Sequence, residues 1–545
     1  MLTLLLLACP ESTPEANDTA VDSATDTADT AVIEAPPTIC DQLALPVRTW
    51  DGSGVDVDFD LVAPDATLTQ TDGSAWTLSE AWTGCESVIF VRLRPGNAYP
   101  DFDSKILVRE WMEGAPANTH WVFFSDERTE SKRTDALAAL QEDIENIADA
   151  DEATLAMWKA HAHYVATDWD QTGTWIDTLV ETYGSGDLPL NFAVDRFQRI
   201  RELGYLADPV TGWNTSPPAF LNYEALYFNG QAAMQDRLDV DGADVLHPFV
   251  NTGERAVSVD FGAAETMATY DTMELDLTFI CNGHPDSVGC GEWDYLAYVY
   301  LCDADDASTT DVDESGICTE IGRFITAYAR PGRWVVDVTP FLAMLQDGGP
   351  RTLRVDSANA PLITLDLRLS NQGKGFRPVQ IDYLWAGGSF NSDYNTGREP
   401  ITFTPPEGTV RTEVWALVTG HGYGKDRANC AEFCNHEHEF TVNGTETWVH
   451  DFAMAGSNYG CGDQVNVGTV PNQYGTWVLG RGGWCPGKQV DPWSADITAA
   501  VAAGAENTLA YRGLYEGDTY VPEAYDSGSG FGAGIVANVW LVHSR

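Results

Sequence analysis

Two acidic residues near the middle of the chain lie in a setting that suits acid–base chemistry. Glu292 and Asp294 flank Trp293 directly after Cys290. A strand that begins at Glu292 would point both carboxylates to one face, because side chains alternate along a strand. Like charges so close raise the pKa of at least one carboxyl group, which favours a general base near neutral pH. A solvated pair of carboxylates at the start of a strand is the alternative interpretation.

A third acidic residue, Glu432, lies at the centre of the run Cys430-Ala-Glu-Phe-Cys434. A disulfide that closes so short a loop recovers little chain entropy, so we expect it to fix Glu432 rather than to stabilise the fold. Farther along, Arg481 and Trp484 lie among glycines beside Cys485. Arginine and tryptophan suit hydrogen bonding to a sugar and stacking on it, or packing inside a loop.

The cysteines indicate disulfides rather than a redox or zinc motif. The chain has 11 cysteines, and an even number, ten, remains when Cys9 is set aside. Such a set suits an oxidising compartment, and no pair has the Cys-x-x-Cys spacing. Spacing predicts the pairs Cys281–Cys290, Cys302–Cys318, Cys430–Cys434 and Cys461–Cys485, which leaves Cys40 with Cys85.

Charge and the opening residues indicate where the protein acts. Asp and Glu number 82 against 30 Lys and Arg, a net charge of -52. Phosphate backbones and anionic lipids repel such a surface, so we expect no nucleic-acid partner. Residues 1–9, apolar up to Cys9, resemble a bacterial lipoprotein signal, and residues 10–39 form an acidic, Thr- and Ala-rich linker expected to be disordered. We therefore expect an exported monomer, secreted or held at the outer membrane or cell surface by a lipid on Cys9.

The rest of the chain divides into three folded segments. Residues 40–240 mix helices and strands, with apolar runs at 88–93 and 121–124 that suit buried strands and helical periodicity over 134–150. From about residue 245 to the end, short strands alternate with turns rich in Gly, Pro, Asp and Asn. This pattern predicts two antiparallel β-sandwiches, 245–387 and 395–545, separated at the polar run 387–395.

The N-terminal segment resembles a thioredoxin-like redoxin domain. The resemblance rests on Ala63-Pro-Asp65, on Asp72-Gly-Ser-Ala-Trp76 and on the strand that ends at Leu93. In that family the redox cysteine follows this strand, whereas here residues 94–99 contain no cysteine. The resemblance therefore implies an α/β domain of thioredoxin type without redox activity.

The C-terminal half resembles the peptide-N-glycosidase F family, on the segments already described and on Glu320-Ile-Gly-Arg-Phe-Ile-Thr-Ala-Tyr328. The resemblance implies two adjacent eight-stranded jelly rolls with the active site at their interface. It implies hydrolysis of the amide between asparagine and the first N-acetylglucosamine of N-glycans, without metal or cofactor, on glycoproteins or glycopeptides. By position, Asp294 matches the essential aspartate, Glu432 the acidic residue that orients the chitobiose core, and Arg481 a substrate-contacting arginine.

Three positions depart from the family pattern. The family has a further glutamate late in the first jelly roll, where this chain offers only Asp366. Tyr295 stands in place of a substrate-contacting arginine, and His421 in place of a tryptophan. Sugar contacts are therefore expected to differ, and loss of a positioning carboxylate typically lowers the rate by orders of magnitude.

Other functions fit some of the same residues. A glycan-binding lectin would keep Arg481, Trp484 and Glu432 without catalysis, and a glycosidase would use Asp294 and Glu432 as its carboxyl pair. His436 and His438, joined by His421, suit a copper or zinc site in a jelly-roll enzyme. The acidic run 303–314 offers calcium ligands, although without an ordered ligand pattern.

Overall fold

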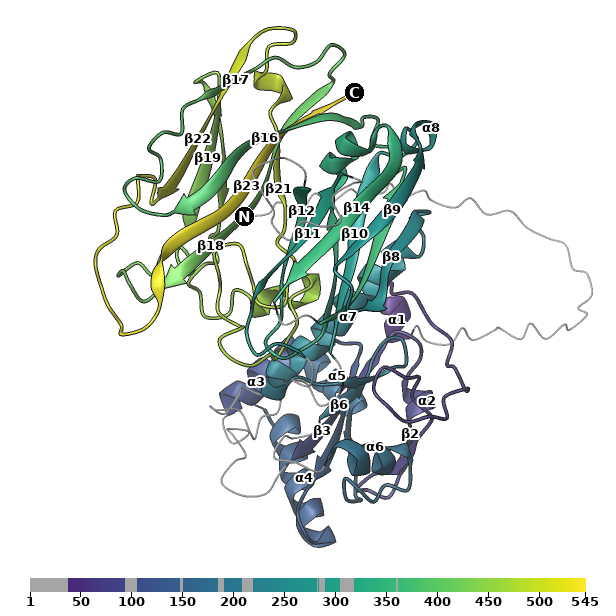
Figure 1. Ribbon diagram of the computed structural model, residues 1–545. Coiled ribbons are helices and arrows are strands. Elements are labelled where there is room, and N and C mark those ends of the chain that lie inside the picture. The colour runs from purple at the N-terminus through teal and green to yellow at the C-terminus, as the bar shows by residue number, and fades with distance from the viewer. Residues whose placement is uncertain are drawn as a thin grey trace, which may run out of the picture.

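The computed structural model describes residues 38–93, 105–147, 150–184, 191–207, 219–281, 283, 290–303, 318–358 and 361–545. The predicted signal, nearly all of the linker, residues 94–99 and residues 304–314 lie outside this part of the chain. Thr38 and Ile39, predicted as the end of the linker, instead form the cap and first residue of α1 (Ile39–Gln42). Among the described helices, none is long and apolar enough to cross a membrane. The chain forms an α/β module followed by two β-sandwiches (Figure 1).

A five-stranded mixed sheet forms the centre of the N-terminal module, in the order β5-β4-β3-β6-β7. The strands β3, β4 and β5 run parallel, whereas β6 and β7 pair antiparallel. Both predicted buried strands are confirmed, as β3 and β4. The bounds are β1 (Thr67–Thr69), β2 (Ala75–Thr77), β3 (Ser87–Leu93), β4 (Thr119–Ser125), β5 (Ala162–Tyr164), β6 (Phe192–Val194) and β7 (Ile200–Glu202).

Helices cover both faces of this sheet because the side chains of β3 and β4 are buried on both faces, with Arg92 alone half-buried. Ile89 and Val91 pack with residues of α3, α4, α5 and α7, while Val88 and Phe90 pack with α2 and α6. The helix predicted over 134–150 is present as α4, one turn earlier and ending at Glu145. The helices are α2 (Leu78–Ala81), α3 (Lys105–Gly114), α4 (Glu130–Glu145), α5 (Glu152–His161), α6 (Trp175–Tyr183) and α7 (Phe220–Leu238).

The first sandwich has two four-stranded antiparallel sheets, β13-β10-β15-β8 and β12-β11-β14-β9. Apolar residues alternate along their strands, and the inward set fills one core. The strands are β8 (Asp244–Thr252), β9 (Ala256–Ala263), β10 (Thr272–Ile280), β11 (Leu296–Cys302), β12 (Cys318–Ile325), β13 (Gly332–Asp337), β14 (Gly348–Ser357) and β15 (Leu362–Ser370).

The second sandwich repeats this topology with the sheets β16-β23-β18-β21 and β17-β22-β19-β20. In both sandwiches the first strand pairs with the last and the second with the seventh, which is the jelly-roll order. The strands are β16 (Pro378–Ser389), β17 (Ile401–Phe403), β18 (Arg411–Tyr423), β19 (His436–Val442), β20 (Glu446–Asp451), β21 (Trp493–Asp496), β22 (Asn507–Tyr515) and β23 (Phe531–Ser544).

The boundary between the sandwiches differs from the prediction. Because β16 belongs to the second sandwich, that sandwich begins at Pro378 and not after the run 387–395. The glycines that resemble a linker serve strand pairing instead. A Cβ at Gly387 would lie 1.9 Å from the Ile535 carbonyl oxygen, so β16 can approach β23 only with glycine there.

Helix α7 connects the module to both sandwiches (Figure 1). Its Gln231 donates to the Arg333 carbonyl oxygen of β13 at 3.2 Å, and a Cβ at Gly230 would lie 2.3 Å from the Asn466 carbonyl oxygen. The sandwiches contact each other where Phe341 packs edge-on against Trp415 and Trp540. The remaining short helices are α8 (Ala264–Met267), η1 (Tyr205–Ala207), η2 (Thr339–Leu345), η3 (Gly462–Val467) and η4 (Thr498–Ala500).

All five predicted disulfides are confirmed. The paired Cα atoms lie 4.0 to 5.7 Å apart, all below the roughly 7 Å beyond which two cysteines cannot be bridged. Four of the five lie in the two sandwiches, and three of them border the segments that carry the candidate site residues. Such a set is typical of exported proteins.

Candidate active site

The end of β18 and two loops of the second sandwich meet where the two sandwiches contact each other. The Gly420 N–H donates to the Gly482 carbonyl oxygen and the Gly482 N–H to the Glu432 carbonyl oxygen, both at 2.7 Å. Across the contact, the Ile325 N–H donates to the Lys488 carbonyl oxygen at 2.8 Å. Backbone hydrogen bonds therefore join the end of β18, which carries His421, to the loops that carry Glu432 and Arg481, and fix the latter loop to the end of β12.

Asp294 lies just before β11, in an irregular segment that follows a bend at Glu292 and Trp293. The strand begins at Leu296, so the predicted start at Glu292 is wrong, and Glu292 does not share a strand face with Asp294. The Thr326 hydroxyl donates to the Trp293 carbonyl oxygen at 3.0 Å and accepts from the Tyr295 N–H at 2.8 Å. Because a side chain uses these backbone groups, the strand ladder starts only after them.

The Asp294 side chain is mostly buried, and its carboxylate is incompletely paired. Its side chain is 10% exposed, and Oδ2 lies 4.0 Å from Arg481 Nη1, with no hydrogen-bond partner among the described residues. Burial raises the pKa of Asp294 above its ordinary value. The Arg481 charge and hydrogen bonding by Tyr328 lower this pKa, but by less.

Glu432 faces the same guanidinium from the second sandwich. Its side chain is 6% exposed; Arg481 Nη1 donates to Oε1, and the Gly422 N–H donates to Oε2 at 3.2 Å. Burial raises the pKa of Glu432, and the nearby Asp294 charge raises it further, against Arg481 and the Gly422 N–H. Two carboxylates therefore share one arginine.

Arg481 and Trp484 form the support beneath these carboxylates. The Arg481 guanidinium donates to the Thr476 hydroxyl at 3.0 Å and lies 4.6 Å from the Phe433 ring centre and 5.0 Å from that of Trp484. The Trp484 indole donates to the Gly420 carbonyl oxygen at 2.5 Å. Both side chains are buried, so of the two predicted roles for Trp484 the structure has the packed one.

His421 lies near Trp484 on one side and, on the other, near Arg323, which forms an ion pair with Glu320. Its ring centre is 4.8 Å from that of Trp484, and Nε2 lies 2.9 Å from the Thr419 hydroxyl. Burial lowers the pKa of His421 to about 3, aided by the charges of Arg323 and Arg481. The imidazole is therefore neutral at physiological pH and adds no charge to the site.

Two of the predicted substrate residues border the site, and one lies elsewhere. Glu292 is exposed and Tyr295 is half-buried, each within two residues of Asp294. Asp366 is on β15, in the sheet that does not carry Asp294, and its Oδ1 lies 2.7 Å from His247 Nδ1 on β8. The structure therefore does not bring Asp366 to the other two carboxylates.

Three residues of the site were not predicted. Trp293 is 55% exposed and offers its ring to solvent beside Asp294, while Tyr328 and Thr326 contact Asp294 and its flanking peptides. The Trp293 and Tyr328 ring centres are 6.5 Å apart. Tyr328 and Thr326 both belong to the motif 320–328. The sequence indicates that this motif is important as a whole, but it does not indicate a role for either residue.

Comparison with known proteins finds sequence similarity in the part of the chain that forms the sandwiches. The family described as "Peptide-N-glycosidase F, C terminal" matches residues 389–542. Peptide-N(4)-(N-acetyl-beta-D-glucosaminyl)asparagine amidase F of Elizabethkingia miricola is 25% identical over 265 residues, 45% of this chain and 69% of that protein. The C-terminal half of the chain is therefore similar in sequence to peptide-N-glycosidase F, with the family match confined to residues 389–542.

Solved structures give more distant similarities. A crystal structure of a peptide-N(4)-(N-acetyl-beta-D-glucosaminyl)asparagine amidase is 19% identical with a TM-score of 0.44, covering 56% of this chain and 96% of that chain. The thioredoxin domain of a thiol-disulfide oxidoreductase from Bacteroides vulgatus is 16% identical with a TM-score of 0.18, covering 27% and 89%. The relation to peptide-N-glycosidase F rests on the sequence comparisons.

Two histidines of the second sandwich bond to each other. His436 and His438 share one face of β19 as predicted, and His436 Nδ1 lies 2.9 Å from His438 Nε2. His438 Nδ1 lies 2.7 Å from the Tyr511 hydroxyl. Burial lowers the pKa of His436 to about 3. These ring nitrogens are used in a core network, so the arrangement does not favour the copper alternative.

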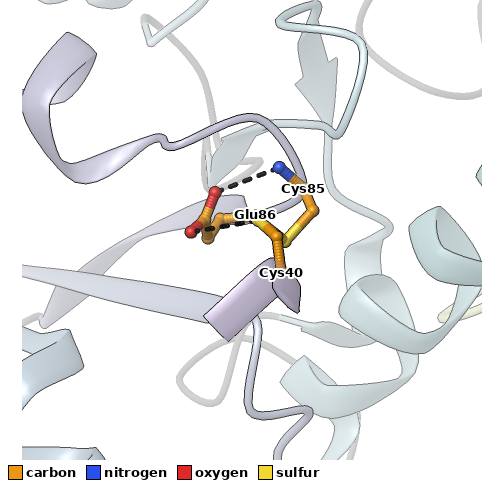
Figure 2. A group of neighbouring side chains, drawn as sticks. All are labelled: Cys40, Cys85 and Glu86. Atoms are coloured by element: carbon orange, nitrogen blue, oxygen red, sulfur yellow. Dashed lines mark hydrogen bonds between the residues drawn. A yellow bond between two sulfur atoms is a disulfide. The ribbon is translucent and has the colours of Figure 1, made fainter. Parts of the chain in front are cut away.

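One group of three potential metal ligands is found among the described residues, namely Cys40, Cys85 and Glu86 (Figure 2). The two cysteines are joined in a disulfide, and the Glu86 carboxylate accepts from the backbone N–H groups of Thr83 at 2.8 Å and Cys85 at 3.1 Å. The potential ligand atoms are therefore already bonded within the protein, and the group joins α1 to the start of β3.

Proposed function

We propose that the protein hydrolyses the amide bond between asparagine and the first N-acetylglucosamine of N-linked glycans on glycoproteins or glycopeptides. The relation of its C-terminal half to peptide-N-glycosidase F supports this proposal. The single observation that carries it is the pair Asp294 and Glu432, buried on either side of Arg481 at the contact between the sandwiches.

Asp294 is the general base of the proposed reaction. Its carboxylate takes a proton from water while the water oxygen attacks the carbonyl carbon of the asparagine side chain. The C–N bond then breaks, and the nitrogen leaves with the sugar and takes up a proton. The products are aspartate and a glycosylamine. Burial, which raises the pKa of Asp294, makes the carboxylate a stronger base than an exposed aspartate.

Glu432 is the second acidic residue and orients the first sugars, while Arg481 positions both carboxylates. Since the Arg481 side chain is 2% exposed, its contribution is through Glu432 and Asp294 rather than through a direct sugar contact. This changes the role inferred from the family resemblance, in which Arg481 contacts substrate.

The exposed ring of Trp293 is the surface on which a sugar stacks, because aromatic faces bind the apolar side of pyranose rings. Glu292 and Tyr295 border it and supply polar contacts. Trp484 supports the site from within, and His421 is a small neutral neighbour. Asp366 takes no part, so the protein works with two acidic residues and a lower rate than a site with three.

The N-terminal module is proposed to be thioredoxin-like and without redox activity. Its mixed sheet with helices on both faces suits that fold, and its two described cysteines form a structural disulfide. We further propose an exported protein that acts as a monomer, with Cys9 as a lipid attachment site. Its strongly acidic surface does not suit a nucleic-acid partner.

Mass spectrometry of a denatured N-glycopeptide, incubated with the protein in ¹⁸O-water, tests the proposal. Release of the whole glycan with conversion of asparagine to ¹⁸O-labelled aspartate is the expected result. An N-acetylglucosamine left on asparagine would instead identify a glycosidase. An unchanged glycopeptide that binds saturably would identify a lectin, and an oxidised glycan formed only with added copper would favour a metal enzyme.

A further inference from the structure

We propose that Glu224, in helix α7 of the N-terminal module, is a positioning residue for the active site. Through Arg330 and Asn472 it holds the two loops that carry Tyr328 and Arg481. The inference rests on the proposed function for its kinetic consequence, whereas the contacts themselves do not depend on the reaction.

One oxygen of Glu224 joins three parts of the chain. Oε1 accepts from the Gly204 N–H at 2.9 Å in the module, from Arg330 Nη1 at 3.0 Å in the first sandwich, and from Asn472 Nδ2 at 3.0 Å in the second. Glu224 is fully buried, and Arg330 and Asn472 are buried beside it. Charge-assisted hydrogen bonds without competing water hold such groups in fixed positions.

From Arg330 the contacts lead to Tyr328. Arg330 also donates to the carbonyl oxygens of Glu202 at 3.0 Å and Pro471 at 2.5 Å, which fixes the segment directly after β12. Two residues earlier, the Tyr328 N–H donates to Gln473 Oε1 at 2.8 Å. The Tyr328 side chain belongs to a small core with Val465 and Trp477, against which Tyr223 and Leu226 of α7 pack. The module therefore forms part of the packing beneath Tyr328.

From Asn472 the contacts lead to Arg481. Asn472 begins the segment that continues through Thr476, whose hydroxyl accepts from Arg481, to Cys485. The approach at Asn472 is close: a Cβ at Gly204 would lie 2.4 Å from the Asn472 carbonyl oxygen and 2.5 Å from Arg330 Nη1. Loosening Glu224 therefore releases both loops at the point where they touch the module.

The consequence for the reaction concerns Asp294. The titratable and charged groups that face it are Arg481, Tyr328 and Glu432, of which Arg481 and Tyr328 lower its pKa. When those two move away, the carboxylate protonates more readily. The rate constant kcat should then fall and the acid limb of the pH profile should move to higher pH. KM should change less than kcat, because Trp293 contacts this network only through Tyr328, at 6.5 Å between ring centres, and through the Thr326 hydroxyl.

The test compares variants of one helix in the full-length protein. Glu224→Ala removes the acceptor, and Glu224→Gln keeps an acceptor oxygen but removes the charge opposite Arg330, in case the alanine variant does not fold. Gln235→Ala is the matched control, since it breaks a hydrogen bond of 2.7 Å from Arg333 on β13, away from the site. We expect a fall in kcat of about 10- to 100-fold for the Glu224 variants, the scale of a 1 Å misplacement, and no change for the control.

Hydrogen–deuterium exchange separates this proposal from the proposed function. Faster exchange over 326–330 and 472–485 in the Glu224 variants, with the sheet cores unchanged and the control unaffected, is expected even if no glycopeptide is cleaved. Cleavage absent in the parent protein would overturn the proposed function alone. Exchange equal to the control would show that Glu224 does not hold these loops, and a fall in activity without movement of the acid limb would show that Glu224 only stabilises the fold.

Discussion

Two buried arginine–glutamate pairs lie at the same contact between the sandwiches, and they differ in how completely they are satisfied. In the first, Arg323 donates to both oxygens of Glu320, at 2.7 and 2.9 Å, to the Thr419 hydroxyl and to the Val536 carbonyl oxygen. Asn538 donates to the same glutamate at 2.5 Å. All of these hydrogen bonds join β12 to β18 and β23 or pair Arg323 with Glu320, so both charged groups have their partners within the protein.

The second pair, Arg481 with Glu432, is incomplete. A further carboxylate, Asp294, shares the guanidinium, and neither Arg481 Nε nor Asp294 Oδ2 has a hydrogen-bond partner among the described residues. Buried polar atoms are rarely left unpaired, and where they are, a functional use is a common reason. The fully paired charges of Arg323 and Glu320 thus stabilise the contact between the sandwiches. The carboxylate of Asp294, which is not fully paired, is available to accept a proton.

The largest expected effect comes from removing that carboxylate. Asp294→Asn keeps the shape of the side chain but loses the base, so deglycosylation should fall by at least about 10³-fold, within the range for general-base catalysis. The measurement is glycan release from a denatured glycopeptide under single-turnover conditions. Asp366→Asn, bonded to His247 outside the site, is the control and should retain full activity. Activity within tenfold of the parent would reject Asp294 as the base.

Removing the shared arginine should change the pH profile as well as the rate. Arg481→Met takes away the positive charge that lowers the pKa of both Asp294 and Glu432. Since the base acts when deprotonated, activity is lost on the acid side, and the limb should move to higher pH, with a fall in kcat of about 10²-fold at neutral pH. The measurement is kcat/KM against pH. A limb that stays in place would show that Arg481 does not act on the base.

A substitution in the fully paired Arg323–Glu320 should lower the stability of the protein and leave the pH dependence of its activity unchanged. Arg323→Met leaves Glu320 buried without its partner, which typically costs about 3–5 kcal/mol of unfolding free energy. Chemical denaturation measures this loss. The double variant Glu320→Leu with Arg323→Met removes both charges and should recover most of it. If the folded Arg323→Met variant moved the acid limb as Arg481→Met does, the distinction between the two pairs would fail.

How far the sequence could predict this site depended on the type of contact. Local features were predictable: spacing predicted the five disulfides, and the short Cys430–Cys434 loop predicted a fixed Glu432, which the structure places in hydrogen bonds to Gly422 and Gly482. Strand patterning predicted the two β-sandwiches. The start of β11 was missed because Thr326, distant in sequence, caps the peptides around Asp294.

Long-range choices between similar residues were not predictable. Asp366 is the acidic residue nearest in sequence to the family's position, but its side of β15 faces His247 on the neighbouring strand. The division between the sandwiches was misplaced because glycines suit both linkers and close strand pairing, and Gly387 serves the second. The part played by α7 was invisible, since it depends on Glu224 meeting residues more than 100 positions away.

The smallest expected effect separates charge from structure at Asp294. Its pKa in the folded protein lies above the ordinary value of 3.8, so the folded state holds the proton more tightly than the unfolded state. The stability of the parent protein therefore falls as the pH rises from about 4 toward the raised pKa of Asp294. The Asp294→Asn variant does not ionise at this position and does not lose stability in this way. The Tm of the variant should exceed that of the parent at neutral pH, and the difference should vanish in acid.

Asp271 provides the control of opposite sign for this measurement. Burial raises its pKa, but hydrogen bonds from the Gln372 and Lys374 N–H groups, at 2.8 and 2.7 Å, leave it below the ordinary value. The folded state thus favours the charged form, and its stabilisation is present above about pH 4 and lost as the pH falls. Asp271→Asn should therefore lower Tm at neutral pH and approach the parent in acid. Parallel melting curves for both variants would mean that neither carboxylate is tuned by its surroundings, and the contrast between complete and incomplete pairing would lose its electrostatic basis.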